Sequence, residues 1–227
     1  MSGDDGAVLT GFQLADSFLP VGSYSSSYAL EQFVQSGRVE DGTDLQRLLA
    51  AYLRRQMGPG EMVALRAAHG AASDGTVDGI VTADERLHAM TFPAEFRESA
   101  TKAGRRLCQL RQATRDSSLL AAYADRDPPR QYPVVLGAVA ALDGIGERRA
   151  CLLSGYAFCS DMLGAGQRLL SLGHTEAQTI IEELKPVVVE AAEESADRTL
   201  DRMAPFAPLA EVESARHERA DRRLFVS

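Results

Sequence analysis

The stretch YPVVLGAVAALDGI, residues 132–145, decides the fold that we expect of this chain. It contains the most apolar segment of the sequence, Pro133 to Leu142. This segment is far shorter than the ~18 residues that a membrane-spanning helix requires. Small residues in its middle would let the backbones of neighbouring helices approach closely; they are Gly137, Ala138, Ala140 and Ala141. We therefore predict a central, buried helix.

On both sides of this stretch, apolar residues recur at the three-and-four spacing of one helical face. The clearest stripes are Leu45, Leu48, Leu49, Tyr52 and Leu53; Phe96, Ala100, Ala103, Leu107 and Leu110; and Leu152, Tyr156, Cys159 and Leu163. Val187 to Val189 could form a strand, but the flanking pattern favours a helix. The sequence predicts an all-α, single-domain bundle of roughly eight to ten helices over residues 1–227. Residues 1–10 are expected to form a short N-terminal tail.

Glycine, proline and hydroxyl residues predict where these helices begin and end. We expect the run Met57 to Gly60 to end one helix, Gly70 to Gly79 to form a polar loop, and Pro186 to kink a helix. We also expect capping boxes, in which Thr82 pairs with Glu85 and Thr175 with Gln178, and a corner at Gly164 and Gly166.

The net charge and the cysteine content argue against several kinds of binding partner and against a secreted, disulfide-linked protein. A net charge of -8 argues against a nucleic-acid partner or an anionic membrane, since phosphate binding needs an excess of basic residues. Lysine occurs only at Lys102 and Lys185, and arginine suits carboxylate contacts at protein interfaces. A GC-rich or salt-adapted genome would explain the same bias. Three cysteines give no disulfide framework, and the acidic start MSGDDG is unlike a signal peptide, so we expect a cytoplasmic protein.

A second stretch, LADSFLPVGSYSSSYALE at residues 14–31, combines a turn with a serine-rich helix start. Pro20 and Gly22 require the chain to turn, and the serines that follow suit the free amides at the start of a helix. Tyr24 and Tyr28 lie one helical turn apart beside them. These tyrosines are equally consistent with a recognition surface and with the edge of a core.

The stretch at residues 14–31 resembles the N-terminal signature of the UreF family of urease accessory proteins. Four more segments resemble the family in the same order: EFRESATKAGRRL (residues 95–107), the stretch 132–145, RLLSLGHTEAQ (168–178) and RHERADRRLFVS (216–227). The chain departs from the family pattern at Ser26, where a histidine is common, at His174, where a glutamine is common, and at residues 220–222.

The resemblance implies a non-catalytic chaperone and adaptor that acts as a homodimer. It would bridge the accessory protein UreD, also called UreH, and the GTPase UreG on the urease apoprotein, for GTP-dependent insertion of nickel. No cofactor is implied for this chain, because nickel is handled by the complex rather than stably bound here. The implied partner-binding residues are Tyr24, Ser26, Ser27, Tyr28, Glu31, Arg168, Arg216, His217, Glu218, Arg223, Leu224 and Phe225.

Residues 205–227 are expected to form a C-terminal partner-docking arm. The arm follows Pro205 and ends on the apolar run Leu224 to Val226. An apolar chain end needs a surface to cover it. From the residues alone, this surface could belong equally to the same domain or to a partner, and the resemblance favours the partner.

Two other classes of protein were weighed. Ser99 and Lys102 form the S-x-x-K pattern of some serine hydrolases, although the companion K-T-G and S-D-N motifs are missing. A generic helical interaction domain is the other alternative. Metal and nucleotide sites are not indicated, because the four histidines lie on separate segments and the sequence has neither a C-x-x-C pair nor a phosphate-binding loop.

Overall fold

The computed structural model describes residues 3–16, 18–21, 29–92 and 94–206. In these ranges the chain is helical and contains no strand. The elements are α1 (Gly3–Ala15), α2 (Leu30–Gln35), α3 (Gly42–Tyr52), η2 (Leu53–Glu61), α4 (Met62–Ser73), α5 (Val77–Met90), α6 (Ala94–Thr114), α7 (Ser118–Asp125), α8 (Tyr132–Leu142), α9 (Glu147–Leu169), α10 (His174–Glu194), η3 (Ser195–Asp197) and η4 (Leu200–Arg202). With α3, η2 and α4 taken as one continuous helix, the described residues form nine helices, which confirms the predicted all-α bundle.

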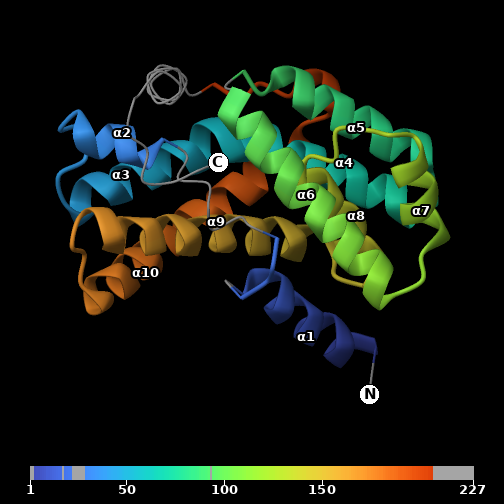
Figure 1. The fold of residues 1–227 in the computed structure, drawn as a ribbon, viewed down its shortest axis with the longest axis horizontal. Helices are drawn as coiled ribbons and strands as arrows, with labels where there is room; N and C mark the ends of the chain where they lie inside the picture. Colours follow the sequence, from blue (N-terminus) through green and yellow to red (C-terminus); the bar gives the residue numbers. More distant parts are fainter. Residues whose placement is uncertain (1–2, 17, 22–28, 93, 207–227) are drawn as a thin grey trace.

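Helix α8 lies at the centre of the bundle, between α4 and α6 and against α5 and α9 (Figure 1). Every residue from Pro133 to Ala140 is buried, as the apolar stretch predicted. The closest approach is at Gly137, where an added Cβ would overlap the carbonyl oxygen of Leu65 on α4. The small side chains thus allow α4 and α8 to form the most extensive helix pair in the described part of the chain.

The prediction that Met57 to Gly60 would end a helix is wrong, because the helix continues through this run as the π-helical segment η2. The wider turn of a π-helix accommodates the missing N–H of Pro59 without breaking the chain direction. The glycines of this run instead leave room for close packing against α10 and Pro205. A Cβ at Gly58 would lie 3.2 Å from the carbonyl oxygen of Ala191 on α10, and one at Gly60 would lie 2.8 Å from Pro205.

Several other expected boundaries also differ. Residues 3–10 are not a tail but belong to α1, which buries Ala7 and Leu14 and packs on α9. The loop expected at 70–79 is confined to residues 74–76. Thr82 lies inside α5 and donates to the Asp78 carbonyl, so it caps nothing. Helix α10 begins one residue before Thr175, after Gly173, without a side-chain cap.

The corner expected at Gly164 and Gly166 is also wrong, since both glycines lie within α9. A Cβ at Gly166 would overlap the side chain of Leu45 on α3, so this glycine serves close packing rather than a turn. The chain turns instead at residues 170–173, where Ser171 has a φ of 55°. The run Val187 to Val189 lies in α10, as the flanking pattern favoured.

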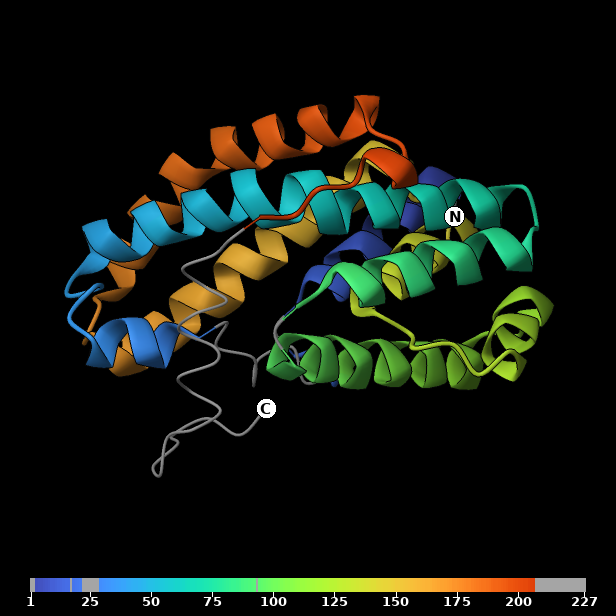
Figure 2. The same ribbon diagram turned by 90° about the horizontal axis from the view of Figure 1, so that it is seen from above.

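Two backbone hydrogen bonds tie the last described residues to η2. The amide of Ala204 donates to the Pro59 carbonyl at 2.9 Å, and the amide of Phe206 donates to the Arg55 carbonyl at 2.8 Å. The segment passes along η2 and α4 before the described chain ends (Figure 2). The predicted arm therefore begins against η2, and the remainder of it lies outside the described residues.

None of the described helices is both long enough and apolar enough to cross a membrane.

Candidate functional site

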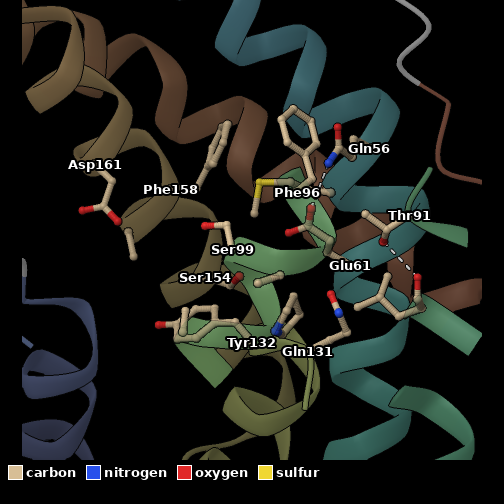
Figure 3. A pocket seen from close by; sticks show the side chains of 16 residues that line it. Gln56, Glu61, Thr91, Phe96, Ser99, Gln131, Tyr132, Ser154, Phe158 and Asp161 are labelled. Atoms are coloured by element: carbon tan, nitrogen blue, oxygen red, sulfur yellow. Dashed lines mark hydrogen bonds between the residues drawn. The ribbon is translucent and has the colours of Figure 1, made fainter. Parts of the chain in front are cut away.

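A small pocket with both polar and apolar walls lies where η2, α6, α8 and α9 meet (Figure 3). It encloses about 60 Å³. Its polar lining comes from Gln56, Glu61, Thr91, Ser99, Gln131, Tyr132, Ser154 and Asp161, and its larger apolar lining from Met57, Leu87, Phe96 and Phe158. Side chains from segments more than a hundred residues apart in the sequence, from Gln56 to Asp161, thus converge on one space.

Glu61 is the last residue of η2, and its carboxylate lines this pocket. Its Oε1 accepts a hydrogen bond from Gln56 Nε2 at 3.1 Å. Burial raises the pKa of Glu61 to about 7, and this effect outweighs the opposing effect of the Gln56 hydrogen bond. Glu61 is therefore poised to change its charge near neutral pH.

Two serine hydroxyls line the same pocket from opposite helices. Ser99 on α6 is 8% exposed and Ser154 on α9 is 6% exposed. Both side chains point into the pocket (Figure 3). Within the described ranges the structure gives neither hydroxyl a hydrogen-bond partner, and both oxygens are accessible from the pocket.

The carboxylate of Asp84 on α5 fixes the backbone that precedes α8, where Gln131 and Tyr132 line the pocket. Asp84 is fully buried and accepts hydrogen bonds from Tyr123 Oη at 2.7 Å, the Arg130 amide at 2.6 Å and the Gln131 amide at 2.7 Å. Burial raises the pKa of Asp84, and these three donors oppose that effect. Asp84 thereby fixes the start of α8 relative to α5 and α7.

The Gln131 side chain lines the pocket and connects this hydrogen-bond network to α5 and α6. Its Nε2 lies 2.9 Å from Thr101 Oγ1 on α6 and 2.9 Å from His88 Nδ1 on α5. Gln131 is only 1% exposed, so these contacts stabilise the pocket floor rather than a surface. None of this network was predicted, because its members are spread over four elements without a common spacing.

The cysteines offer no reactive or metal-binding group. Cys108, Cys151 and Cys159 are free and buried. Burial raises the pKa of Cys151 to about 11 and that of Cys159 to about 12, so both thiols stay protonated at neutral pH. Across the described residues, no group of three His, Cys, Asp or Glu side chains is placed to hold a metal ion.

A second feature is an apolar surface over α1, α9 and α10. One hollow is lined by α1 and α9, another by α9 and α10, and both share Leu152 and Tyr156. The lining side chains left open to solvent include Phe12 at 69%, Tyr156 at 43% and Val8 at 41% exposed. Tyr156 had been predicted as part of an inward-facing stripe; it lies at the centre of this apolar surface instead.

The structure places only two of the predicted partner-binding residues. Glu31 on α2 is 1% exposed and accepts from Gln35 Nε2 at 3.1 Å, so within a single chain it is not accessible to a partner, contrary to expectation. Arg168 is exposed in the last turn of α9. Tyr24, Ser26, Ser27, Tyr28, Arg216, His217, Glu218, Arg223, Leu224 and Phe225 lie outside the described residues and remain predictions.

The Ser99 and Lys102 pattern does not form a catalytic pair in this fold. Ser99 is buried and lines the pocket, whereas Lys102 is exposed and does not line it. Ser99 was therefore singled out for the wrong reason. Glu61 and Ser154 were missed, and the only hint of Glu61 in the sequence was an acidic residue directly after a glycine-proline run expected to lie at a helix end.

Comparison with known proteins bears on this geometry. The family model UreF matches residues 39–185, a range that includes every residue lining the pocket. The chain belongs to the UreF family. Full-length relatives agree: the urease accessory protein UreF of Trichodesmium erythraeum (strain IMS101) is 30% identical over 219 residues, covering 95% of this chain and 94% of that protein.

Two further UreF proteins show the same coverage. Urease accessory protein UreF 1 of Brucella melitensis biotype 1 is 31% identical over 220 residues, covering 95% of this chain and 90% of the relative. UreF of Yersinia enterocolitica serotype O:8 is 28% identical over 217 residues, covering 94% and 95%. The family resemblance expected from five short segments is thus confirmed along almost the whole chain.

Proposed function

We propose that this UreF-family chain is a non-catalytic adaptor in urease maturation. It bridges UreD, also called UreH, and the GTPase UreG on the urease apoprotein, and supports GTP-dependent insertion of nickel in the cytoplasm. The protein acts as a homodimer and binds no cofactor of its own. An adaptor of this kind works by differential binding, since it favours one arrangement of its partners over another.

The observation that carries this proposal is the apolar surface over α1, α9 and α10. Val8, Phe12 and Tyr156 are between 41% and 69% exposed, and they line two hollows with almost wholly apolar walls. Contiguous apolar surface of this kind is typical of protein–protein interfaces. Among the described residues that line the two hollows, the charged ones are Arg149 and Lys185, and this mostly apolar lining favours a permanent contact such as that between two copies of the chain.

The arrangement of polar side chains favours an adaptor over the serine hydrolase. A hydrolase of the S-x-x-K type needs the lysine amine beside the serine hydroxyl. Here Ser99 faces the pocket while Lys102 faces solvent, and the structure gives no hydrogen bond between them within the described ranges. The substitution Lys102→Ala separates the two functions, because it would abolish a hydrolase of this type and, at an exposed position outside the pocket, spare complex assembly.

Co-expression tests the adaptor function directly. The chain is expressed with UreD and UreG, purified, and the mass and stoichiometry of the eluted complex are measured with and without GTP and nickel. We expect both partners to be retained by the intact chain and lost when residues 216–227 are deleted. Loss of neither partner would overturn the role of the C-terminal arm, and retention of no partner by the intact chain would overturn the adaptor function.

A further inference from the structure

The pocket in Figure 3 has the electrostatic character of a cation site. Glu61 contributes a carboxylate to its lining, and among the described residues that line it there is no Lys, Arg or His. The Glu61 carboxylate receives one hydrogen bond within the described chain, from the neutral Gln56 amide. A partly buried carboxylate without a cationic neighbour favours a positively charged guest.

The pocket also holds hydrogen-bonding capacity that the chain does not use. Ser99 and Ser154 are residues more than nine-tenths buried, and neither hydroxyl has a partner in the part of the chain that the structure describes, although both stay accessible from the pocket. Each can accept a hydrogen bond from a donor that enters the pocket. The site thus offers carboxylate and hydroxyl acceptors around one small space.

The walls favour an organic cation over a metal ion. Met57, Phe96 and Phe158 bring a thioether and two phenyl rings to the pocket, and these groups do not replace the water around a hard divalent cation. The described residues also supply no set of three metal ligands. A guanidinium fits these walls, because it is planar, weakly hydrated, stacks on aromatic rings and pairs with carboxylates through two parallel hydrogen bonds.

The size of the pocket indicates how this guanidinium arrives. The enclosed volume of about 60 Å³ is far below the roughly 300 Å³ or more of sites that enclose whole small molecules. It suffices for a head group whose stem and backbone stay outside. We propose that this pocket binds the side chain of an arginine from a docking protein, which inserts between η2, α6 and α9. The existence of a docking protein rests on the proposed adaptor function, whereas the choice of an arginine side chain rests on the residues that line the pocket.

The test uses small probes, so that it does not depend on any partner. The intact chain, labelled with ¹³C on its methionine methyl groups, is titrated with N-acetyl-arginine methylamide and, in parallel, with the neutral isostere N-acetyl-citrulline methylamide. We expect the arginine probe to shift the Met57 resonance with saturation in the millimolar range. The citrulline probe should bind at least tenfold more weakly.

Variants separate the pocket from nonspecific attraction to an acidic protein. Glu61→Gln keeps the shape of the side chain, and it should weaken the arginine probe at least tenfold. Ser154→Val fills the pocket and should do the same without changing any charge. Glu183→Gln is the matched control, since Glu183 is an exposed acid on α10 and its loss should leave binding unchanged.

Equal binding of arginine and citrulline, or equal loss in Glu61→Gln and Glu183→Gln, would overturn the proposal. So would displacement of the arginine probe by an equimolar divalent cation, because the site would then belong to a metal. If neither probe binds while UreD and UreG are still retained, the arginine pocket is wrong and the adaptor function stands. Success of the probes without partner retention would leave the pocket and remove the adaptor function.

Discussion

The hydroxyl of Tyr123 donates a hydrogen bond to Oδ2 of Asp84 at 2.7 Å, with both side chains fully buried. This contact joins α7 to α5, and the same carboxylate receives the backbone amides that precede α8. One acidic side chain therefore fixes three helices. Because a buried carboxylate is costly unless every lone pair is satisfied, the contact should matter greatly for stability.

We expect Tyr123→Phe to lower the free energy of unfolding by about 1–3 kcal/mol, since it leaves one Asp84 lone pair buried without a donor. Urea denaturation followed by circular dichroism measures this. Tyr156→Phe is the control, because it removes the same hydroxyl from a 43% exposed side chain that lines the α1–α9 hollow, away from Asp84. A loss for Tyr123→Phe no larger than for the control would show that Asp84 does not depend on this donor.

Glu61 should make the stability of the protein depend on pH. Its pKa rises from 4.5 to about 7 on folding, so the folded state binds the proton more tightly than the unfolded chain. This contribution to stability is complete below pH 4.5 and disappears as the pH rises to 7, by about 3 kcal/mol in total at most. Glu61→Gln should flatten the stability profile between pH 4.5 and 7. An unchanged slope in the variant would assign the pH dependence to other groups.

The crossing of α4 and α8 predicts a severe effect of a single methyl group. Gly137→Ala places a Cβ on the carbonyl oxygen of Leu65, where backbone cannot move aside, so we expect a loss of about 3 kcal/mol or more. Gly70 on α4 is the matched control, because a Cβ there meets nothing within 4 Å. Gly70→Ala should stabilise by up to about 1 kcal/mol through helix propensity. Thermal unfolding of both variants distinguishes the two expectations.

The apolar surface around Tyr156 predicts a change in oligomeric state. Tyr156→Asp puts a charge among Leu152, Phe12 and Val188, and this charge would be buried wherever a second copy covers the surface. We expect the variant to remain folded and to elute as a monomer, as measured by light scattering. Lys185→Ala, at the margin of the surface, should remain dimeric. A Tyr156→Asp protein that still forms dimers would place the interface elsewhere.

Fold class was readable from the sequence, whereas the geometry of the pocket was not. The stripe from Phe96 to Leu110 and the apolar run from Pro133 to Leu142 predict their helices, because burial of one helical face imposes a local period on the sequence. The continuation of the chain through Pro59 could not be predicted in this way. It depends on contacts with α10 and with Pro205, which are distant in the sequence.

The pocket escaped prediction for the same reason. Glu61, Ser99, Ser154 and Gln131 come from four segments, and nothing in their spacing indicates that they meet. Asp84 likewise belongs to an ordinary helical pattern until its partners on two other elements are known. Conversely, the family resemblance implies a partner-binding role for Glu31, and only the packing of α2 shows that this side chain is buried within the chain.

The two amide hydrogen bonds from Ala204 and Phe206 to η2 give the C-terminal end of the described chain a mechanical role. They anchor it to Pro59 and Arg55, within the same π-helical turns that carry Gln56 and Glu61. Any protein that pulls on the chain beyond residue 206 thus exerts force on the very turns that shape the pocket. Docking at the C-terminal end and occupancy of the pocket would therefore act on the same backbone segment, η2.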